Sequence, residues 1–155
     1  MIEEVEDSLA SRLGQAMHSL LEHAGETAQG WSPARVAQLA HGLSITFAQA
    51  AQAAGAARRI LAGEGAWAWD GALIDWQGNE VELVWRGSAL RIDRLVRRAD
   101  TGEWWVLDYK SAEAPERQPA LRAQMRQYRE AVQALQGGVV RCAFLTASGA
   151  MVVVE

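Results

Sequence analysis

Apolar residues recur at nearly helical spacing through the first part of the chain. Leu9, Leu13 and Leu20 fall on one face and predict a helix from about Val5 to Ala24, with Gly25 as its stop signal. The pattern therefore predicts an amphipathic helix as the first element.

An alanine-rich stretch comes next. Ser32 precedes Pro33, which is the order of a helix N-cap and the proline favoured at the first helical position. The residues from Ala34 to about Leu61 then predict two helices, broken near His41-Gly42 or Gly55. This portion is expected to be mainly helical.

Beyond residue 66 the chain changes to short apolar runs separated by turn residues, which is typical of β-strands. The predicted strands are Trp67–Trp76 (weakly), Glu80–Trp85, Ala89–Arg97, Glu103–Lys110, Val139–Leu145 and Ala150–Val154. Gly78-Asn79 is predicted to be a turn, and Asp100-Thr101-Gly102 a tighter one that closes a hairpin.

A helix is predicted over Gln118–Gln136, with Gly137 as its end. The chain is therefore expected to form a single domain over residues 1–155. Residues 1–62 would be mainly helical, and residues 66–155 would hold a sheet core with helix 118–136. The predicted fold class is mixed α/β.

Composition narrows the class of protein. Half of the 155 residues are apolar, enough for one sizeable core, yet no apolar run is long enough for a membrane span. The acidic start does not resemble a secretory signal. Cys142 is the only cysteine, which excludes disulfides and cysteine-ligated metal sites and favours a cytoplasmic location. The sequence has no phosphate-binding loop of the Gly-x-x-x-x-Gly-Lys type, so no bound nucleotide cofactor is expected.

The net charge of −4 argues weakly against nucleic acid as a partner. The arginines are clustered, however, with five between residues 86 and 98 and four between residues 117 and 129. A locally basic face on an acidic domain is therefore compatible with the sequence.

Two carboxylates stand inside apolar strands. A hairpin turn centred on Asp100 and Thr101 would place Asp93 opposite Asp108 to within one residue, with Cβ atoms about 4.5–5.5 Å apart. Two like charges at that distance are unfavourable unless a cation lies between them. Either a divalent metal fills this role, or arginines such as Arg91 and Arg94 form structural ion pairs, and the residues alone leave both readings open.

Lys110 is the only lysine beside fourteen arginines, and it lies two residues beyond Asp108. Both side chains should therefore project from the same face of the strand. An ammonium can give up its proton or position a water, whereas a guanidinium stays charged. Lys110 is thus a candidate catalytic residue.

These residues resemble the RecB-type nuclease domains of the PD-(D/E)XK superfamily. The motifs occur in the family's order: Gly14 with His18, Ile92-Asp93-Arg94, Asp108-Tyr109-Lys110-Ser111, and Gln124 with Tyr128. The resemblance implies a restriction-endonuclease-like mixed central sheet flanked by helices. It also implies a metal-dependent nuclease.

The resemblance further implies a role for each matching position. His18, Asp93, Asp108 and the Tyr109 carbonyl would bind Mg²⁺ or Mn²⁺, and Lys110 would be the catalytic lysine. The family often has an additional acid on the preceding strand, for which Glu80 fits slightly better than Glu82. Gln124 and Tyr128 would line the active-site edge and either contact the DNA strand or hold Lys110 in place. Independently of the resemblance, Arg122 and Arg126 beside Gln124 on the predicted helix suit a phosphate backbone and are added to this DNA-binding edge.

The resemblance implies that the chain is the DNA exonuclease module of a helicase–nuclease that processes DNA ends in recombination and repair. The helicase motor would be in the same parent chain or a separate subunit. One alternative is a catalytically silent DNA-binding or docking module of the same fold, and another is a metal-binding domain acting on RNA or a nucleotide.

Overall fold

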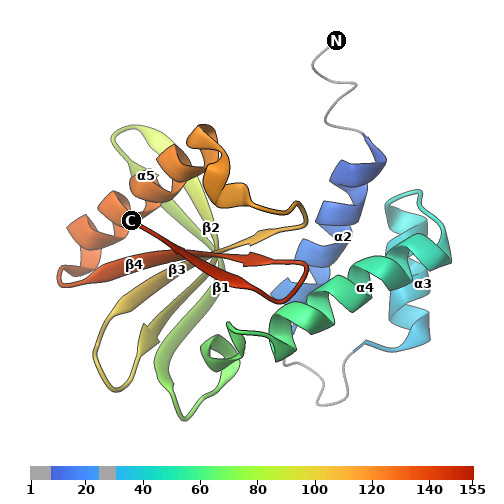
Figure 1. The fold of residues 1–155 in the computed structure, drawn as a ribbon, viewed down its shortest axis with the longest axis horizontal. Coiled ribbons are helices and arrows are strands. Elements are labelled where there is room, and N and C mark those ends of the chain that lie inside the picture. Colours follow the sequence, from blue (N-terminus) through green and yellow to red (C-terminus); the bar gives the residue numbers. More distant parts are fainter. Residues whose placement is uncertain (1–7, 25–30) are drawn as a thin grey trace.

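A five-stranded mixed sheet, in the order β1-β2-β3-β4-β5, forms the centre of the structure (Figure 1). The computed structural model describes residues 8–24 and 31–155. The elements along the chain are α2 (Leu9–Glu22), α3 (Pro33–Gly42), α4 (Phe47–Ala62), η1 (Ala66–Trp69), β1 (Ile74–Trp85), β2 (Ser88–Arg98), β3 (Trp104–Lys110), η2 (Pro115–Arg117), α5 (Pro119–Gln136), β4 (Val140–Thr146) and β5 (Met151–Val154). Strands β1 to β3 form an antiparallel meander. Strands β3 and β4 are parallel neighbours that α5 connects along the chain, and β5 pairs antiparallel with β4. The predicted mixed α/β class is confirmed.

Strand β3 lies between two cores. Leu107 and Tyr109 pack with helices α2, α3 and α4 on one face, whereas Trp104 and Val106 pack with α5 on the other. Burial on both faces explains why the strand is nearly continuously apolar in sequence. It also means that Asp108, only 4% exposed, is a carboxylate inside the protein.

The first predicted helix is found as α2, with Ser8 as its N-cap. The predicted start at Val5 and the predicted stop at Gly25 lie outside the described residues. Within the described segments, no helix is both long and apolar enough to cross a lipid bilayer.

The alanine-rich stretch forms two helices, as predicted. Ser32 caps α3 and Pro33 is its first residue. The break follows Gly42, because Thr46 starts a new helix with a reciprocal capping box. Gly55, the alternative position for the break, lies within α4.

Two strand predictions were wrong. Trp67–Trp76 is not one strand: its first part is the short helix η1, and β1 begins only at Ile74. Gly78-Asn79 is not a turn, because both residues pair with β2, opposite Leu95 and Arg94. The ladder to β2 outweighs the local turn preference, and the irregular backbone occurs instead at Glu80, with φ of 50°.

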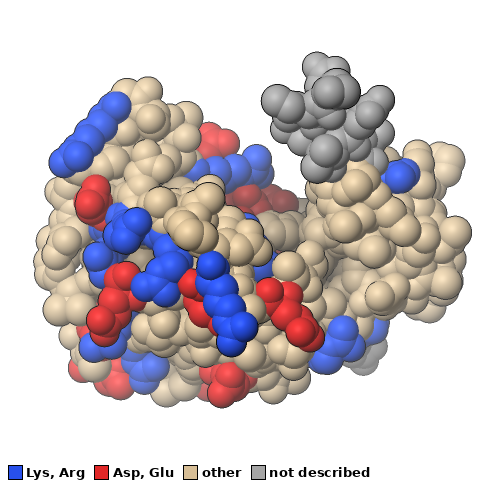
Figure 2. All heavy atoms as spheres, turned by 45° about the horizontal axis from the view of Figure 1, so that its top comes forward, with Lys and Arg blue, Asp and Glu red and all other residues tan. Residues whose placement is uncertain are grey.

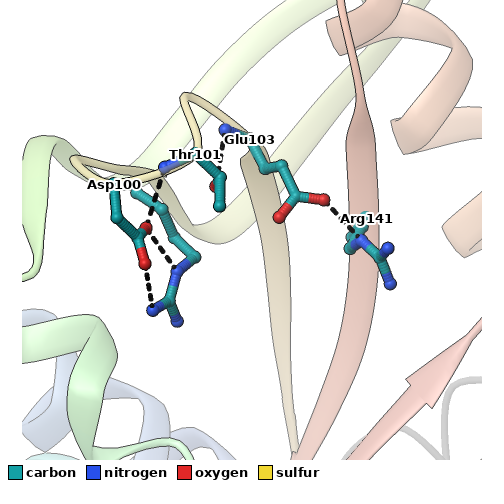
Figure 3. A network of polar contacts seen from close by, with 5 residues as sticks. Asp100, Thr101, Glu103 and Arg141 are labelled. Atoms are coloured by element: carbon teal, nitrogen blue, oxygen red, sulfur yellow. Dashed lines mark hydrogen bonds and ion pairs between the residues drawn. The ribbon is translucent and has the colours of Figure 1, made fainter.

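The β2–β3 hairpin has the predicted register, since Arg94 pairs with Leu107 and Arg97 with Trp104. Side chains fix its turn (Figure 3). Asp100 accepts from Arg98 at 3.0 and 3.1 Å and from the Thr101 N–H at 2.9 Å. This network lies at the Asp100 end of the hairpin, whereas Asp93 and Asp108 lie toward its other end.

The C-terminal end of α4 packs closely against the β4–β5 turn. The Glu64 N–H donates to the Gly149 carbonyl at 2.9 Å, and the Met151 N–H donates to the Glu64 carboxylate at 2.9 Å. A Cβ on Gly63 would clash with the Gly149 carbonyl and would lie 2.7 Å from that of Arg59. Glycine at residue 63 therefore permits this backbone contact.

Gly63→Ala is expected to lower the free energy of unfolding by about 2 kcal/mol, because overpacking a well-packed contact costs about 1–3 kcal/mol. Urea unfolding followed by circular dichroism measures the change. Gly42→Ala is the control, since a Cβ there meets nothing within 4 Å and replaces glycine at the end of α3. Equal unfolding midpoints for the two variants would contradict this account.

Candidate active site

A groove of about 510 Å³ runs between helix α2, the interior of the β1–β2 pair and the end of strand β3. Its polar lining comes from elements far apart in sequence. The lining residues that carry chemistry are His18 and Glu22 of α2, Glu80 and Arg91 of the β1–β2 pair, and Tyr109, Lys110 and Ser111 at the end of β3.

His18 links α2 to the sheet. Its Nε2 lies 3.0 Å from the Tyr109 carbonyl oxygen, and its Nδ1 lies 3.4 Å from Oδ1 of Asp93. Both ring nitrogens thus face acceptors. Burial opposes protonation, but the hydrogen bond to Asp93, its charge and the carbonyl outweigh it, so the pKa of His18 is raised.

Asp93 and Glu80 lie at an interruption of the β1–β2 ladder. Pairing passes from Asn79 opposite Arg94 to Val81 opposite Ile92, which leaves these two acids between the paired positions. The Tyr109 N–H of β3 donates to Oδ2 of Asp93 at 2.8 Å. A carboxylate thus accepts from the backbone of the neighbouring strand at a point where regular pairing has ended.

The charge state of Asp93 follows from these contacts. Burial tends to raise the pKa of Asp93, but His18 and the Tyr109 N–H stabilise the anion and the pKa is lowered. Glu80 responds in the opposite direction. Burial and the charge of Asp93 raise its pKa, although Arg91 at 2.6 Å favours the anion.

Asp108 and Lys110 lie on one face of β3, as predicted. The ammonium Nζ is 3.1 Å from Oδ2 of Asp108. Burial and then the charge of Asp93 raise the pKa of Asp108 to about 7, although Lys110 acts against the increase. Within the described part of the chain this oxygen is buried and accepts no well-directed hydrogen bond. Asp93 and Asp108 are thus two neighbouring buried carboxylates, and Lys110 does not fully offset their negative charge.

The donor set fits a hard divalent cation. One ligand atom from each of His18, Glu80 and Asp93 lies within 4.8 Å of the other two. The Tyr109 carbonyl contacts the same histidine, and Asp108 carries the under-satisfied oxygen. Carboxylate and carbonyl oxygens suit Mg²⁺, and an added imidazole suits Mn²⁺ as well.

The structure does not bring all predicted site residues together. Tyr128 of α5 is buried, and its pKa is raised to about 12 by burial and then by the charges of Asp108 and Asp93. Gln124 is exposed on the same helix. Arg122 and Arg126 lie elsewhere, at a tightly packed depression beside Cys142. Of the four, Tyr128 is therefore the one that the carboxylates influence.

The role of Arg94 was not foreseen from sequence, where it was considered only as an ion-pair partner for the acids. It is 1% exposed, and its Nη2 donates to the Ala68 carbonyl at 2.6 Å and to Gln77 at 2.8 Å. Its Nη1 donates to Asn79 at 2.8 Å, and the guanidinium lies 4.7 Å from the ring of Trp69.

Asn79 extends this contact to α2, because its Nδ2 donates to the Glu22 carbonyl at 3.0 Å. Arg94 thereby joins the helix that carries His18 to the strands that carry Glu80 and Asp93. An arginine inside an apolar strand was the available sequence signal. Its neutral partners could not be inferred without the fold.

A search of curated proteins finds no match to the chain. The family model of the PD-(D/E)XK nuclease superfamily matches residues 2–153. The mixed sheet with flanking helices is consistent with the restriction-endonuclease-like architecture that the sequence resemblance implied. The chain therefore belongs to the PD-(D/E)XK nuclease superfamily.

Proposed function

We propose that this chain is a divalent-metal-dependent deoxyribonuclease of the RecB type. Its role would be the exonuclease module of a helicase–nuclease that processes DNA ends in recombination and repair. The observation that carries the proposal is the cluster of His18, Glu80 and Asp93, of which His18 and Glu80 line the same groove as Lys110. Superfamily membership supports it, since PD-(D/E)XK proteins are generally metal-dependent nucleases.

The proposed metal ligands are His18, Asp93, Asp108 and the Tyr109 carbonyl, with Glu80 as an additional acid. Bound Mg²⁺ or Mn²⁺ would supply Lewis-acid stabilisation of the charge that develops on a phosphodiester. The pKa of Asp108, about 7, makes this carboxyl responsive to a nearby cation. Binding of a cation would favour its anionic form.

Lys110 is the proposed catalytic lysine. Its Nζ faces the groove side of β3 next to Asp108, where an ammonium can orient a water and offset negative charge on the phosphate.

We further propose that Gln124, Arg122 and Arg126 contribute to the DNA-binding edge, and that the buried Tyr128 supports this edge from within α5. Because Arg122 and Arg126 do not line the groove, they would contact the strand outside it. Figure 2 shows basic and acidic side chains interspersed on the left half of the molecule, which holds the sheet (Figure 1). DNA would therefore be held through local arginine contacts.

The proposed function has consequences for the domain extent, the partners and the location of the chain. We propose one domain over residues 1–155, with the helicase motor in the same parent protein or in a partner subunit. No nucleotide cofactor and no membrane partner are expected for this chain. A cytoplasmic location is proposed from the single, buried thiol of Cys142.

Digestion of end-labelled linear DNA tests the proposed function. We expect cutting with Mg²⁺ or Mn²⁺ and none with EDTA, because hydrolysis needs a cation to stabilise the charge that develops on the phosphodiester. Duplex DNA, single-stranded DNA and single-stranded RNA are compared under the same conditions. Preferential cutting of RNA, or binding of DNA without cutting in any metal, would overturn the assignment in favour of an RNA-directed enzyme or a silent module.

A further inference from the structure

A second cavity of about 450 Å³ adjoins the groove. It lies between the C-terminal part of α4, the segment that follows Lys110 and the β4–β5 turn, and we call it the Arg59 cavity. Its polar lining residues are Arg59, Ser111, Glu113, Thr146 and Ser148. Ser111 lines both the groove and this cavity, so the two are neighbours at the residue that follows Lys110.

Arg59 is fixed by a neutral partner. Its Nε donates to the Ala147 carbonyl oxygen at 2.7 Å. Among the described residues, this leaves the two terminal guanidinium nitrogens available for an anion. Planar guanidinium nitrogens suit the oxygen atoms of a phosphate and can bind two of them together.

Hydroxyl groups add further donors. The side-chain oxygens of Thr146 and Ser148 lie 3.0 Å apart, and Ser111 faces the same space. The β4–β5 turn is also tied to the catalytic strand, because the Ala147 N–H donates to the Lys110 carbonyl at 3.1 Å. The cavity therefore has a fixed position relative to Lys110.

The partners of Lys110 and Arg91 in the groove differ from the partner of Arg59. Lys110 pairs with Asp108, and Arg91 pairs with Glu80, so both groove cations offset acids. Arg59 contacts a carbonyl and retains its charge for a ligand. Glu113 is the one acid in the lining, and its negative charge would repel a bound anion. Removing that charge should therefore strengthen anion binding, whereas removing the charge of Arg59 should weaken it.

We propose that the Arg59 cavity is a phosphate-binding subsite, which holds a phosphate of the nucleic-acid strand next to the one that is cut. This phosphate is either internal to the strand or at its end. The inference rests on the proposed nuclease function and deepens it, since it assigns to α4 a contact with substrate. It also gives a path for the strand, from the groove past Ser111 toward Arg59.

The test is binding of an internally labelled single-stranded DNA, measured by fluorescence anisotropy in EDTA so that no cutting occurs. Arg59→Gln is expected to weaken binding about tenfold, because the variant loses the charge-assisted hydrogen bonds of the guanidinium to the phosphate. The slope of log affinity against log salt should fall by about one. Arg59→Lys, which keeps the charge, should recover part of the loss.

Arg58→Gln is the matched control, with the same charge change one residue away. Arg58 lies 5.6 Å from the ring of Trp31. We expect this variant to bind like the parent protein, and Glu113→Gln to bind more tightly. Equal binding by Arg59→Gln and Arg58→Gln, or no measurable binding by the parent protein, would overturn the subsite.

Three forms of the DNA distinguish the two sources of phosphate: one with a 5′-phosphate, one with a 3′-phosphate and one with hydroxyls at both ends. An effect of Arg59→Gln confined to one phosphorylated end would assign the cavity to that terminal phosphate. An equal effect on all three would assign it to an internal one. Failure of the nuclease proposal is seen separately, as absence of cutting by the parent protein while the Arg59 effect on binding persists.

Discussion

Asp93→Asn is expected to abolish metal-dependent DNA cutting, with kcat/KM lowered about 1000-fold or more, because metal-ion catalysis supplies several kcal/mol of charge stabilisation. The amide oxygen of asparagine can still accept the Tyr109 N–H, which donates to Asp93 at 2.8 Å. The fold should therefore survive while the negative charge is lost. Digestion rates of end-labelled DNA in Mg²⁺ and Mn²⁺ measure the effect.

Thermal unfolding separates a ligand role from a structural one. At a Mn²⁺ concentration about 100 times its dissociation constant, binding stabilises the folded state by about 2.7 kcal/mol, or about 5–10 °C in a chain of this size. The parent protein should show this increase and Asp93→Asn should not.

Asp75→Asn is the control for this pair of measurements. Asp75 is an exposed carboxylate paired with Arg97 at 2.8 Å, and such surface pairs contribute little to stability. This variant should cut DNA and respond to Mn²⁺ like the parent protein. A Mn²⁺ increase in unfolding temperature that persists in Asp93→Asn would show that the metal binds elsewhere.

The hairpin that carries Asp93 and Asp108 was predictable because its information is local. Turn residues at Asp100 and Thr101 and the apolar pattern of the two strands specify one register, and the structure has that register. The position of Lys110 beside Asp108 follows from the same alternation. Local signals therefore predicted the centre of the candidate site.

Features that depend on contacts between distant elements were not predictable. Gly78-Asn79 has the composition of a turn, but pairing with β2 keeps it extended, and Glu80 takes the left-handed backbone instead. The cluster of His18, Glu80 and Asp93 combines a helix with two strands. A sequence pattern alone does not give that distance.

The same limit explains two residues whose roles emerged only from the fold. Arg94 donates to oxygens of η1 and β1, and Arg59 donates to a turn 88 residues away in sequence. Each is an arginine among fourteen in the chain, so its residue type carries little information. Which cations bind substrate and which stabilise the fold is decided by their partners.

Lys110→Arg is expected to lower kcat about 100-fold or more while DNA binding changes little. The charge is kept, so attraction to phosphate persists. The longer guanidinium would make a two-pronged pair with Asp108 and cannot give up its proton, whereas positioned proton transfer contributes about 100- to 10,000-fold. Single-turnover cutting measures the chemical step, and anisotropy in EDTA measures binding.

Arg141→Lys is the control variant, because it also exchanges one cationic side chain for the other. Arg141 donates to Glu103 at 2.7 Å in the network at the Asp100 end of the hairpin, away from the groove (Figure 3). That variant should cut at the parent rate, because its charge has no part in the chemistry. If Lys110→Arg also cuts at the parent rate, Lys110 acts only as a positive charge, and its proton is not needed. If binding falls as much as cutting, the lysine instead holds the substrate, and the catalytic role proposed for it is wrong.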